Sequence, residues 1–159
     1  MSVELEIEKK IILKRLPDIK YDTILKITQY YLKNNNNEWE RYRKRRDKSD
    51  NKSQYFRTIK KTVRMGVCLE DEIKISKREF KEKVKICSRK ISKTRYVKSV
   101  DDNLFWEIDV FDNISLVMAE IEIPNEDYEI IYPKWIQDNI ISDVTGIKGF
   151  SNRRMSEKL

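Results

Sequence analysis

Apolar and charged residues alternate along the first part of the chain. In the segment 3–8 (VELEIE), the carboxylates of Glu4, Glu6 and Glu8 lie two residues apart, with apolar residues between them. Because successive side chains of a β-strand point to opposite faces, this pattern predicts a strand over residues 3–10 with one charged face. The same period of two predicts seven further strands, at residues 26–32, 39–46, 55–62, 67–75, 92–98, 104–111 and 115–123. The short connections favour a sheet that is antiparallel throughout.

After residue 75 the period changes to that of a helix. Ser76 and Glu79 form a capping box, with a serine at the cap and a glutamate three residues later. Behind the box, apolar residues recur at the spacing of one helical face: Phe80, Val84, Cys87 and Ile91. This pattern predicts an amphipathic helix that runs to about Lys90.

The remaining segments predict turns and short helices. Four consecutive asparagines at 34–37 predict a turn, because asparagine tolerates left-handed backbone conformations. We expect hairpin connections at 100–103 and 112–113, and a turn at 144–146. Residues 18–24 are expected to form a short helix or loop, and residues 135–141 another helix.

One face of nearly every predicted strand carries charged side chains. These are Glu4, Glu6, Glu8 and Lys10; Arg41, Arg43 and Arg45; Lys60; Glu70 and Glu72; Lys93 and Arg95; Glu107 and Asp109; and Glu120 and Glu122. For a single strand, the simplest interpretation is a half-buried sheet whose charged face meets water. Like charges about 7 Å apart along a strand nevertheless cost free energy unless opposite charges face them. A closed barrel with a polar interior and an apolar exterior covered by helices meets that need.

Composition narrows the chemistry. The 159-residue chain is expected to form one domain over residues 1–159, and it lacks histidine, which excludes a serine–histidine triad and imidazole metal sites. Three glycines argue against a glycine-rich phosphate loop, and two cysteines without close spacing indicate neither a disulfide framework nor a zinc site. The net charge of +7 suits an anionic partner, although many basic proteins bind no anion specifically. Without a long apolar run or a signal-peptide pattern, we expect a soluble cytoplasmic protein with no membrane partner.

The alternating faces suggest a ligand that combines cations with phosphates. Acidic strands would hold oxygen-bound Mg²⁺ or Mn²⁺, and basic strands would hold phosphate groups. A metal–polyphosphate complex requires both. Phosphoryl transfer depends mostly on positioning and charge stabilisation, so the chain needs no nucleophilic side chain for it.

Motifs along the chain resemble, in order, those of the CYTH superfamily, the triphosphate tunnel metalloenzymes. The matching segments are 6–10 (EIEKK), 27–32 (ITQYYL), 41–43 (RYR), 58–60 (TIK), 70–72 (EDE), 93–96 (KTRY), 106–111 (WEIDVF), 119–122 (AEIE), 133–136 (PKWI) and 144–146 (VTG). The resemblance implies an α+β, mainly β fold: an eight-stranded antiparallel closed barrel with a few flanking helices. It also implies a divalent-metal-dependent triphosphatase that acts on inorganic triphosphate, ATP or another nucleoside triphosphate, as a monomer or homodimer.

The resemblance assigns roles residue by residue. The implied metal ligands are Glu6, Glu8, Glu120 and Glu122, with Asp109 and Glu72 close by. The implied phosphate-binding residues are Lys10, Arg41, Arg43, Lys60, Lys93 and Arg95. Lys93 is expected to help position the attacking water, and together with Glu6 and Glu8 it forms the expected catalytic set.

Three positions depart from the family pattern. Gly149 stands where the family usually has an arginine, and Lys148 beside it is expected to supply the missing charge. Cys68 also stands where an arginine often precedes the acidic strand, and the segment 29–31 lacks the family's glycine. These departures put the substrate preference in doubt. Four alternatives stay open: an adenylyl cyclase, which the resemblance does not separate from a hydrolase; an RNA 5′-triphosphatase, which the net charge of +7 favours; a non-catalytic nucleotide- or polyphosphate-binding module, for which Gly149 leaves room; and a general nucleic-acid binder.

Overall fold

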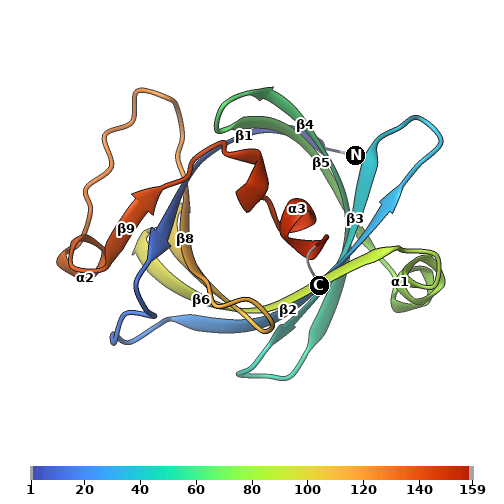
Figure 1. Cartoon of the computed structure of the whole chain (residues 1–159). Coiled ribbons are helices and arrows are strands. Elements are labelled where there is room, and N and C mark those ends of the chain that lie inside the picture. Colours follow the sequence, from blue (N-terminus) through green and yellow to red (C-terminus); the bar gives the residue numbers. More distant parts are fainter. Residues whose placement is uncertain (1, 158–159) are drawn as a thin grey trace.

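Eight antiparallel strands close into a barrel in the computed structural model, which describes residues 2–157 (Figure 1). The strands are β1 (Ser2–Leu13), β2 (Thr23–Lys33), β3 (Trp39–Asp47), β4 (Ser53–Arg64), β5 (Val67–Ile75), β6 (Arg89–Asp101), β7 (Leu104–Phe111) and β8 (Val117–Glu122). Around the barrel they follow the order β1-β5-β4-β3-β2-β6-β7-β8, and β8 returns to β1. The predicted eight-stranded antiparallel barrel is confirmed.

Strand β1 closes the barrel by pairing at both of its ends. Its residues 2–7 pair with β5, and its residues 8–13 pair with β8. Because the strands of a barrel tilt against its axis, one long strand can pair with different neighbours along its length. A ninth strand, β9 (Ile140–Asp143), pairs with residues 11–13 of β1 outside the ring.

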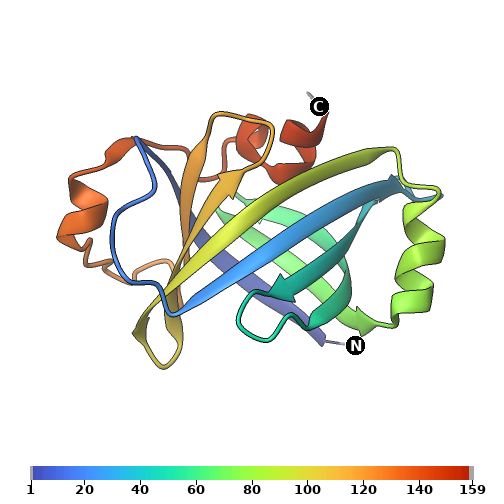
Figure 2. The ribbon, with the colours of Figure 1, turned by 90° about the horizontal axis from the view of Figure 1, so that it is seen from below.

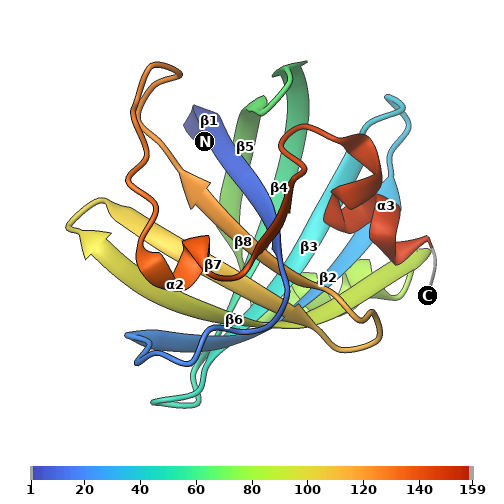
Figure 3. The same ribbon diagram turned by 60° about the vertical axis from the view of Figure 1, so that its left-hand side comes forward.

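The barrel is apolar outside and charged inside. Helix α1 (Lys77–Val84) covers one side of the wall, where Phe80 packs with Tyr42, Tyr55 and Ile75. On the other side, α2 (Lys134–Gln137) and the segment before it cover β7 and β8, and Ile136 joins the apolar cluster there (Figure 3). The predicted arrangement of a polar interior with helices over an apolar exterior is therefore confirmed. Within residues 2–157, no helix has the length and apolar character needed to cross a membrane.

The C-terminal segment closes one end of the barrel. The 3₁₀ helix η1 (Lys148–Phe150) leads into α3 (Asn152–Ser156), which lies inside the ring in Figure 1 and at one end of it in Figure 2. Beneath α3, interior apolar residues of the strands form a layer, and Met155 of α3 packs on it; the strand residues are Tyr31, Ile91, Phe111 and Met118. We call this the closed end. At the opposite end, the open mouth, lie the β3–β4 and β6–β7 turns.

Two sequence predictions were wrong in detail. The helix predicted to run to Lys90 ends at Val84, and Ile91 lies on β6 opposite Gln29. The helical spacing of Ile91 is coincidental, because pairing with β2 and burial at the closed end decide its conformation. The helix predicted for 135–141 ends at Gln137, and the residues from Ile140 pair with β1 instead.

The remaining local predictions hold in part. Residues 18–22 form a loop, and β2 already begins at Thr23. The hairpin connection expected at 100–103 is limited to residues 102–103, because β6 extends to Asp101. The asparagine turn contains Asn37 at φ 62°, in the left-handed region, and the turn at 144–146 contains Gly146 at φ 70°. A side chain at Gly146 would also meet Met65, with its Cβ 2.2 Å from the Met65 Cγ. A larger residue is therefore excluded there both by conformation and by space.

Candidate functional site

Four charged side chains are almost completely buried at the centre of the barrel. Lys93, Arg95, Asp109 and Glu120 are each 7% exposed or less. Arg95 donates from Nε and Nη2 to the two carboxylate oxygens of Asp109 at 2.8 and 3.0 Å. The Lys93 Nζ lies 2.7 Å from Asp109 Oδ2, and Arg95 Nη2 lies 3.6 Å from Glu120 Oε2. We call these four residues the buried ionic cluster.

Strand register brings this cluster together. Arg95 on β6 lies directly opposite Asp109 on β7, and Glu107 on β7 lies opposite Glu120 on β8. The alternation of side chains turns all of these residues to the interior. Glu107 also accepts a hydrogen bond from Arg95 Nη1 at 2.9 Å.

Charge pairing decides how the cluster ionises. Burial alone would raise the pKa of Asp109, but Arg95 and Lys93 lower it below its ordinary value. Burial likewise opposes ionisation of Glu120, and Lys10 and Arg95 lower its pKa well below the usual range. Burial lowers the pKa of Lys93 to about 8, although Asp109 acts in the opposite direction. The cluster is thus ionic because each carboxylate has a cation in contact with it.

An acidic wall lies beside the cluster on β1, β5 and β8. Glu6 and Glu70 both contact Lys60, whose Nζ lies 2.8 Å from Glu6 Oε1 and 3.2 Å from Glu70 Oε2. Glu8 lies opposite Glu122 in the β1–β8 register. We call these four glutamates the acidic wall.

The acidic wall carries more negative charge than the chain compensates. Burial and the charge of Glu120 raise the pKa of Glu8 to about 8, and Lys10, 3.7 Å away, offsets this only in part. Partial burial, together with Glu6 and Glu70, raises the pKa of Glu122 to about 7. These carboxylates would ionise more readily beside an additional cation.

The donor set fits a divalent metal ion. It consists of carboxylate oxygens whose charge Lys10 and Lys60 compensate only in part, and hard cations such as Mg²⁺ prefer oxygen ligands of this kind. Within residues 2–157, no group of three or more histidine, cysteine, aspartate or glutamate side chains lies close enough to hold a metal by itself. Mg²⁺ commonly uses one or two carboxylates and completes its shell with water and substrate phosphates. Glu8 and Glu122 are directly paired on the adjacent strands β1 and β8, and they fit that mode.

A basic wall lies across the interior on β3. Arg41 donates to Thr58 Oγ1 at 3.1 Å and lies 3.3 Å from a Glu72 carboxylate oxygen. Arg43 donates from Nε and Nη2 to the amide oxygen of Gln29, at 3.0 and 2.8 Å. Burial, followed by Arg41 and Arg95, lowers the pKa of Arg43, so this wall holds an excess of positive charge. An anion placed between the walls would compensate that excess.

The closed end contacts two of the predicted phosphate-binding lysines. Lys10 Nζ donates to the backbone carbonyl of Phe150 at 3.4 Å, and Lys93 Nζ donates to Asn152 Oδ1 at 2.9 Å. Lys148, expected to replace a missing arginine, is exposed on η1 and is not part of the buried ionic cluster.

Most of the residues assigned from sequence face the same interior. Glu72 contacts Arg41 and not the acidic wall, and both oxygens of Asp109 accept from cations of the chain. Three polar residues that support the site were not predicted: Gln29 and Thr58, which are buried, and Asn152. Gln29 and Thr58 stand at interior positions of alternating strands, and that position was the available signal.

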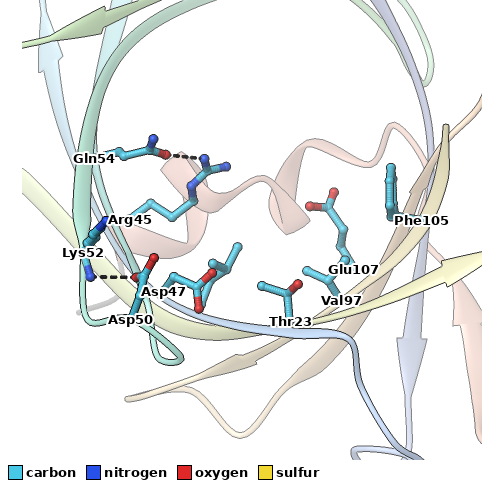
Figure 4. Close-up of a pocket in the computed structure, with 10 residues that line it drawn as sticks. Thr23, Arg45, Asp47, Asp50, Lys52, Gln54, Val97, Phe105 and Glu107 are labelled. Carbon is cyan, nitrogen blue, oxygen red and sulfur yellow. Dashed lines mark hydrogen bonds between the residues drawn. The ribbon is translucent and has the colours of Figure 1, made fainter. Parts of the chain in front are cut away.

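A cavity of about 410 Å³ opens at the mouth opposite α3 (Figure 4). Its lining residues are Thr23, Leu25, Arg45, Asp47, Asp50, Lys52, Gln54, Val97, Phe105 and Glu107. A neighbouring cavity of about 620 Å³ shares Phe105 and Glu107 with it. Both cavities lie outside the buried ionic cluster.

The chain is similar to solved structures that cover between 77% and 95% of its length. One of them is the crystal structure of the inorganic triphosphatase NE1496, whose sequence is 27% identical to this chain. The match covers 95% of this chain and 93% of that chain, with a TM-score of 0.60. The PH1819 protein from Pyrococcus horikoshii OT3 is 17% identical, with 77% and 80% covered and a TM-score of 0.59. No protein-family model and no curated protein sequence matches the chain. The resemblance to the triphosphate tunnel metalloenzymes is confirmed by the closed eight-stranded barrel and by its similarity to NE1496.

Proposed function

We propose that this chain is a divalent-metal-dependent triphosphatase that hydrolyses inorganic triphosphate or a nucleoside triphosphate inside the barrel. The observation that carries the proposal is the pair of opposed walls, acidic at Glu8 and Glu122 and basic at Arg41 and Arg43, within one closed interior. The similarity to a protein described as an inorganic triphosphatase supports the reaction class.

The basic wall would bind the phosphate chain. Arg43 bonds to the neutral amide of Gln29, and no carboxylate within residues 2–157 is in hydrogen-bonding contact with it, so its positive charge is available to a phosphate oxygen. Lys10, Arg41, Lys60 and Arg95 would contact the remaining oxygens. Lys10 and Lys60 would exchange part of their contact with glutamates for contact with phosphate.

Glu6, Glu8 and Glu122 of the acidic wall, together with Glu120 of the buried ionic cluster, would hold Mg²⁺ or Mn²⁺. A bound divalent ion neutralises phosphate charge and lowers the pKa of its bound water. Asp109 and Glu72 would mainly orient the cations that they contact, which are Lys93, Arg95 and Arg41.

Lys93 would position the attacking water or the terminal phosphate. An ammonium group has three hydrogens, and in the structure Lys93 directs two of them to Asp109 and Asn152. The third hydrogen meets no acceptor in the described part of the chain and could donate to a substrate or water oxygen in the interior. The contacts with Asp109 and Asn152 hold the Lys93 Nζ at this position.

A substrate panel tests the proposal. Purified protein is incubated with inorganic triphosphate and with nucleoside triphosphates, using Mg²⁺ and Mn²⁺ separately, and released phosphate is measured. We expect turnover of at least one triphosphate, its loss on chelation, and its loss in Glu8→Gln and Arg43→Gln. Arg46→Gln, an exposed change on the same strand as Arg43, serves as the matched control and should retain activity.

The products separate the alternatives. If cyclic AMP is the main product from ATP, the protein is an adenylyl cyclase and the proposed hydrolysis is wrong. Tight calorimetric binding of triphosphate without turnover would instead indicate a binding module. Inactivity of the wild-type protein across the whole panel, with both metals, would overturn the proposal.

A further inference from the structure

The open mouth continues directly outward from the phosphate-binding interior. On three strands, the next interior position toward the mouth lies two residues from a residue of the site. These pairs are Arg43 and Arg45 on β3, Arg95 and Val97 on β6, and Asp109 and Glu107 on β7. In each case the outer residue lines the 410 Å³ cavity. Two residues along a strand span about 7 Å, so a triphosphate bound between Arg43 and Arg95 would place its far end at this cavity.

The cavity has the size and the apolar surface of a site for an organic group. Its volume of about 410 Å³ falls within the range of small-molecule sites. Leu25, Val97 and Phe105 contribute apolar surface to it, and a bare polyphosphate gains nothing from such a surface. The Phe105 side chain is 42% exposed although it stands at an interior strand position. An exposed ring at a mouth offers a face on which a flat aromatic group can stack.

The polar lining of the cavity favours a ligand that donates hydrogen bonds. Three carboxylates line it, those of Asp47, Asp50 and Glu107, against the two cations Arg45 and Lys52. Arg45 is held by the amide oxygen of Gln54 at 2.6 Å and lies over the Phe56 ring. In Figure 4, Arg45 and Gln54 lie on one side of the cavity, and Glu107 and Phe105 lie on the other.

The carboxylate of Asp47 is ionised at neutral pH. Hydrogen bonds from the backbone and the hydroxyl of Ser49 lower its pKa below the ordinary value. An ionised acceptor at the rim attracts N–H donors and repels a further phosphate. This lining therefore disfavours a polyanion such as RNA, whose next phosphates would leave through the mouth.

We infer that the open mouth is a subsite for the base of a nucleoside triphosphate, in which Phe105 stacks on the base and Asp47 accepts a hydrogen bond from its amino group. This inference rests on the proposed function and deepens it, because it selects amino-bearing nucleotides over inorganic triphosphate and over RNA 5′ ends. Phe105 and Asp47 act on specificity and take no part in the phosphate chemistry.

Equilibrium binding tests the subsite. Calorimetry with Mg²⁺ compares the β,γ-methylene analogue of ATP with the methylene analogue of inorganic triphosphate. We expect Phe105→Ala to weaken binding of the nucleotide analogue about tenfold or more, since base–aromatic stacking contributes at that level. Binding of the inorganic analogue should stay unchanged. Asp47→Asn should weaken the ATP analogue and leave the corresponding inosine analogue, which lacks the amino group, unchanged.

Matched controls and contrary outcomes keep the two proposals apart. Ile131→Ala, at a side chain 87% exposed, and Asp138→Asn, on the surface at α2, should change neither ligand. Equal affinity of wild-type protein for both analogues, or equal effects of Phe105→Ala on both, would overturn the subsite and leave the triphosphatase proposal intact. Tighter binding of a 5′-triphosphorylated dinucleotide than of the ATP analogue would also overturn it. Failure of the wild-type protein to bind either analogue would overturn both proposals.

Discussion

The Lys93 ammonium lies 2.7 Å from the Asp109 carboxylate inside the barrel, with the two side chains 1% and 0% exposed. Removing such charges from water costs several kcal/mol of free energy per ion. The attraction between them offsets this only when their remaining polar atoms also form hydrogen bonds. Here Arg95 binds both carboxylate oxygens of Asp109, and Asn152 accepts from Lys93. The pair therefore has a fixed geometry at the place where we expect the substrate to react.

Loss of the Asp109 carboxylate should destabilise the fold strongly. In Asp109→Ala, both Lys93 and Arg95 remain buried without their main counter-charge, and breaking a buried pair in this way costs about 3–5 kcal/mol. The free energy of unfolding from urea titration measures the effect. Asp138→Ala, at an exposed ion pair on α2, should change stability by no more than about 0.5 kcal/mol. A loss below about 1 kcal/mol for Asp109→Ala would contradict the buried ionic interior.

Ionisation of Glu8 should make stability depend on pH. Its pKa of about 8 in the fold lies above the ordinary value of 4.5, because burial and Glu120 raise it while Lys10 and Lys60 lower it and Glu6 raises it slightly. A raised pKa stabilises the fold fully below about pH 4.5, and that contribution is lost as the pH rises through 8. In chelator, Glu8→Gln should therefore gain stability relative to wild type between these values. Urea titrations across this range measure the difference, which Glu82→Gln on the surface of α1 should not show.

Binding of a divalent metal ion should restore the stability that the fold loses when Glu8 ionises. A ligand that binds only the folded state raises the melting temperature with its concentration. At pH 8 we expect Mg²⁺ or Mn²⁺ to raise the melting temperature of wild type, and to raise that of Glu8→Gln by less than half as much. At pH 5, where Glu8 is protonated, the gain for wild type should shrink. If the metal raises the melting temperatures of both proteins equally at pH 8, Glu8 is not a ligand of the metal.

Alternation predicted the strands, because a barrel with a charged interior imposes a strict period of two on each strand. Lys93, Asp109 and Glu120 could be assigned to one face from this pattern alone. The ion-pair partner of each charge could not be predicted, because it depends on the register between strands. In the structure Glu72 contacts Arg41, and Lys60 contacts Glu6. The closed end also escaped prediction, because Asn152 lies in a short helix without a strong local pattern and reaches Lys93 only in the folded chain.

Gln29 should be required to hold Arg43 inside the barrel. Its amide oxygen accepts both hydrogen bonds that Arg43 makes to it, and its side chain is fully buried. Gln29→Leu would leave a partly buried guanidinium without its acceptor, which costs about 1–3 kcal/mol. Gln54→Leu removes the equivalent acceptor from Arg45 at the open mouth, where water can replace it, and should cost less. Equal stability losses in the two variants would contradict a desolvated Arg43.

Lys93 should contact both α3 and the substrate, so a stronger contact with α3 should weaken the contact with phosphate. Asn152 occupies one hydrogen of the Lys93 ammonium, and Phe150 accepts from Lys10, so α3 docks on two groups assigned to phosphate. Asn152→Asp adds a negative charge beside Lys93, which should strengthen docking of α3 and weaken triphosphate binding. We expect slower amide hydrogen exchange in residues 152–156 together with a higher KM. Asn113→Asp, an exposed change in the β7–β8 connection, should alter neither measurement. A higher KM without slower exchange would mean that the added carboxylate acts by repelling phosphate alone, whereas both effects together would show that substrate and α3 share the same lysine.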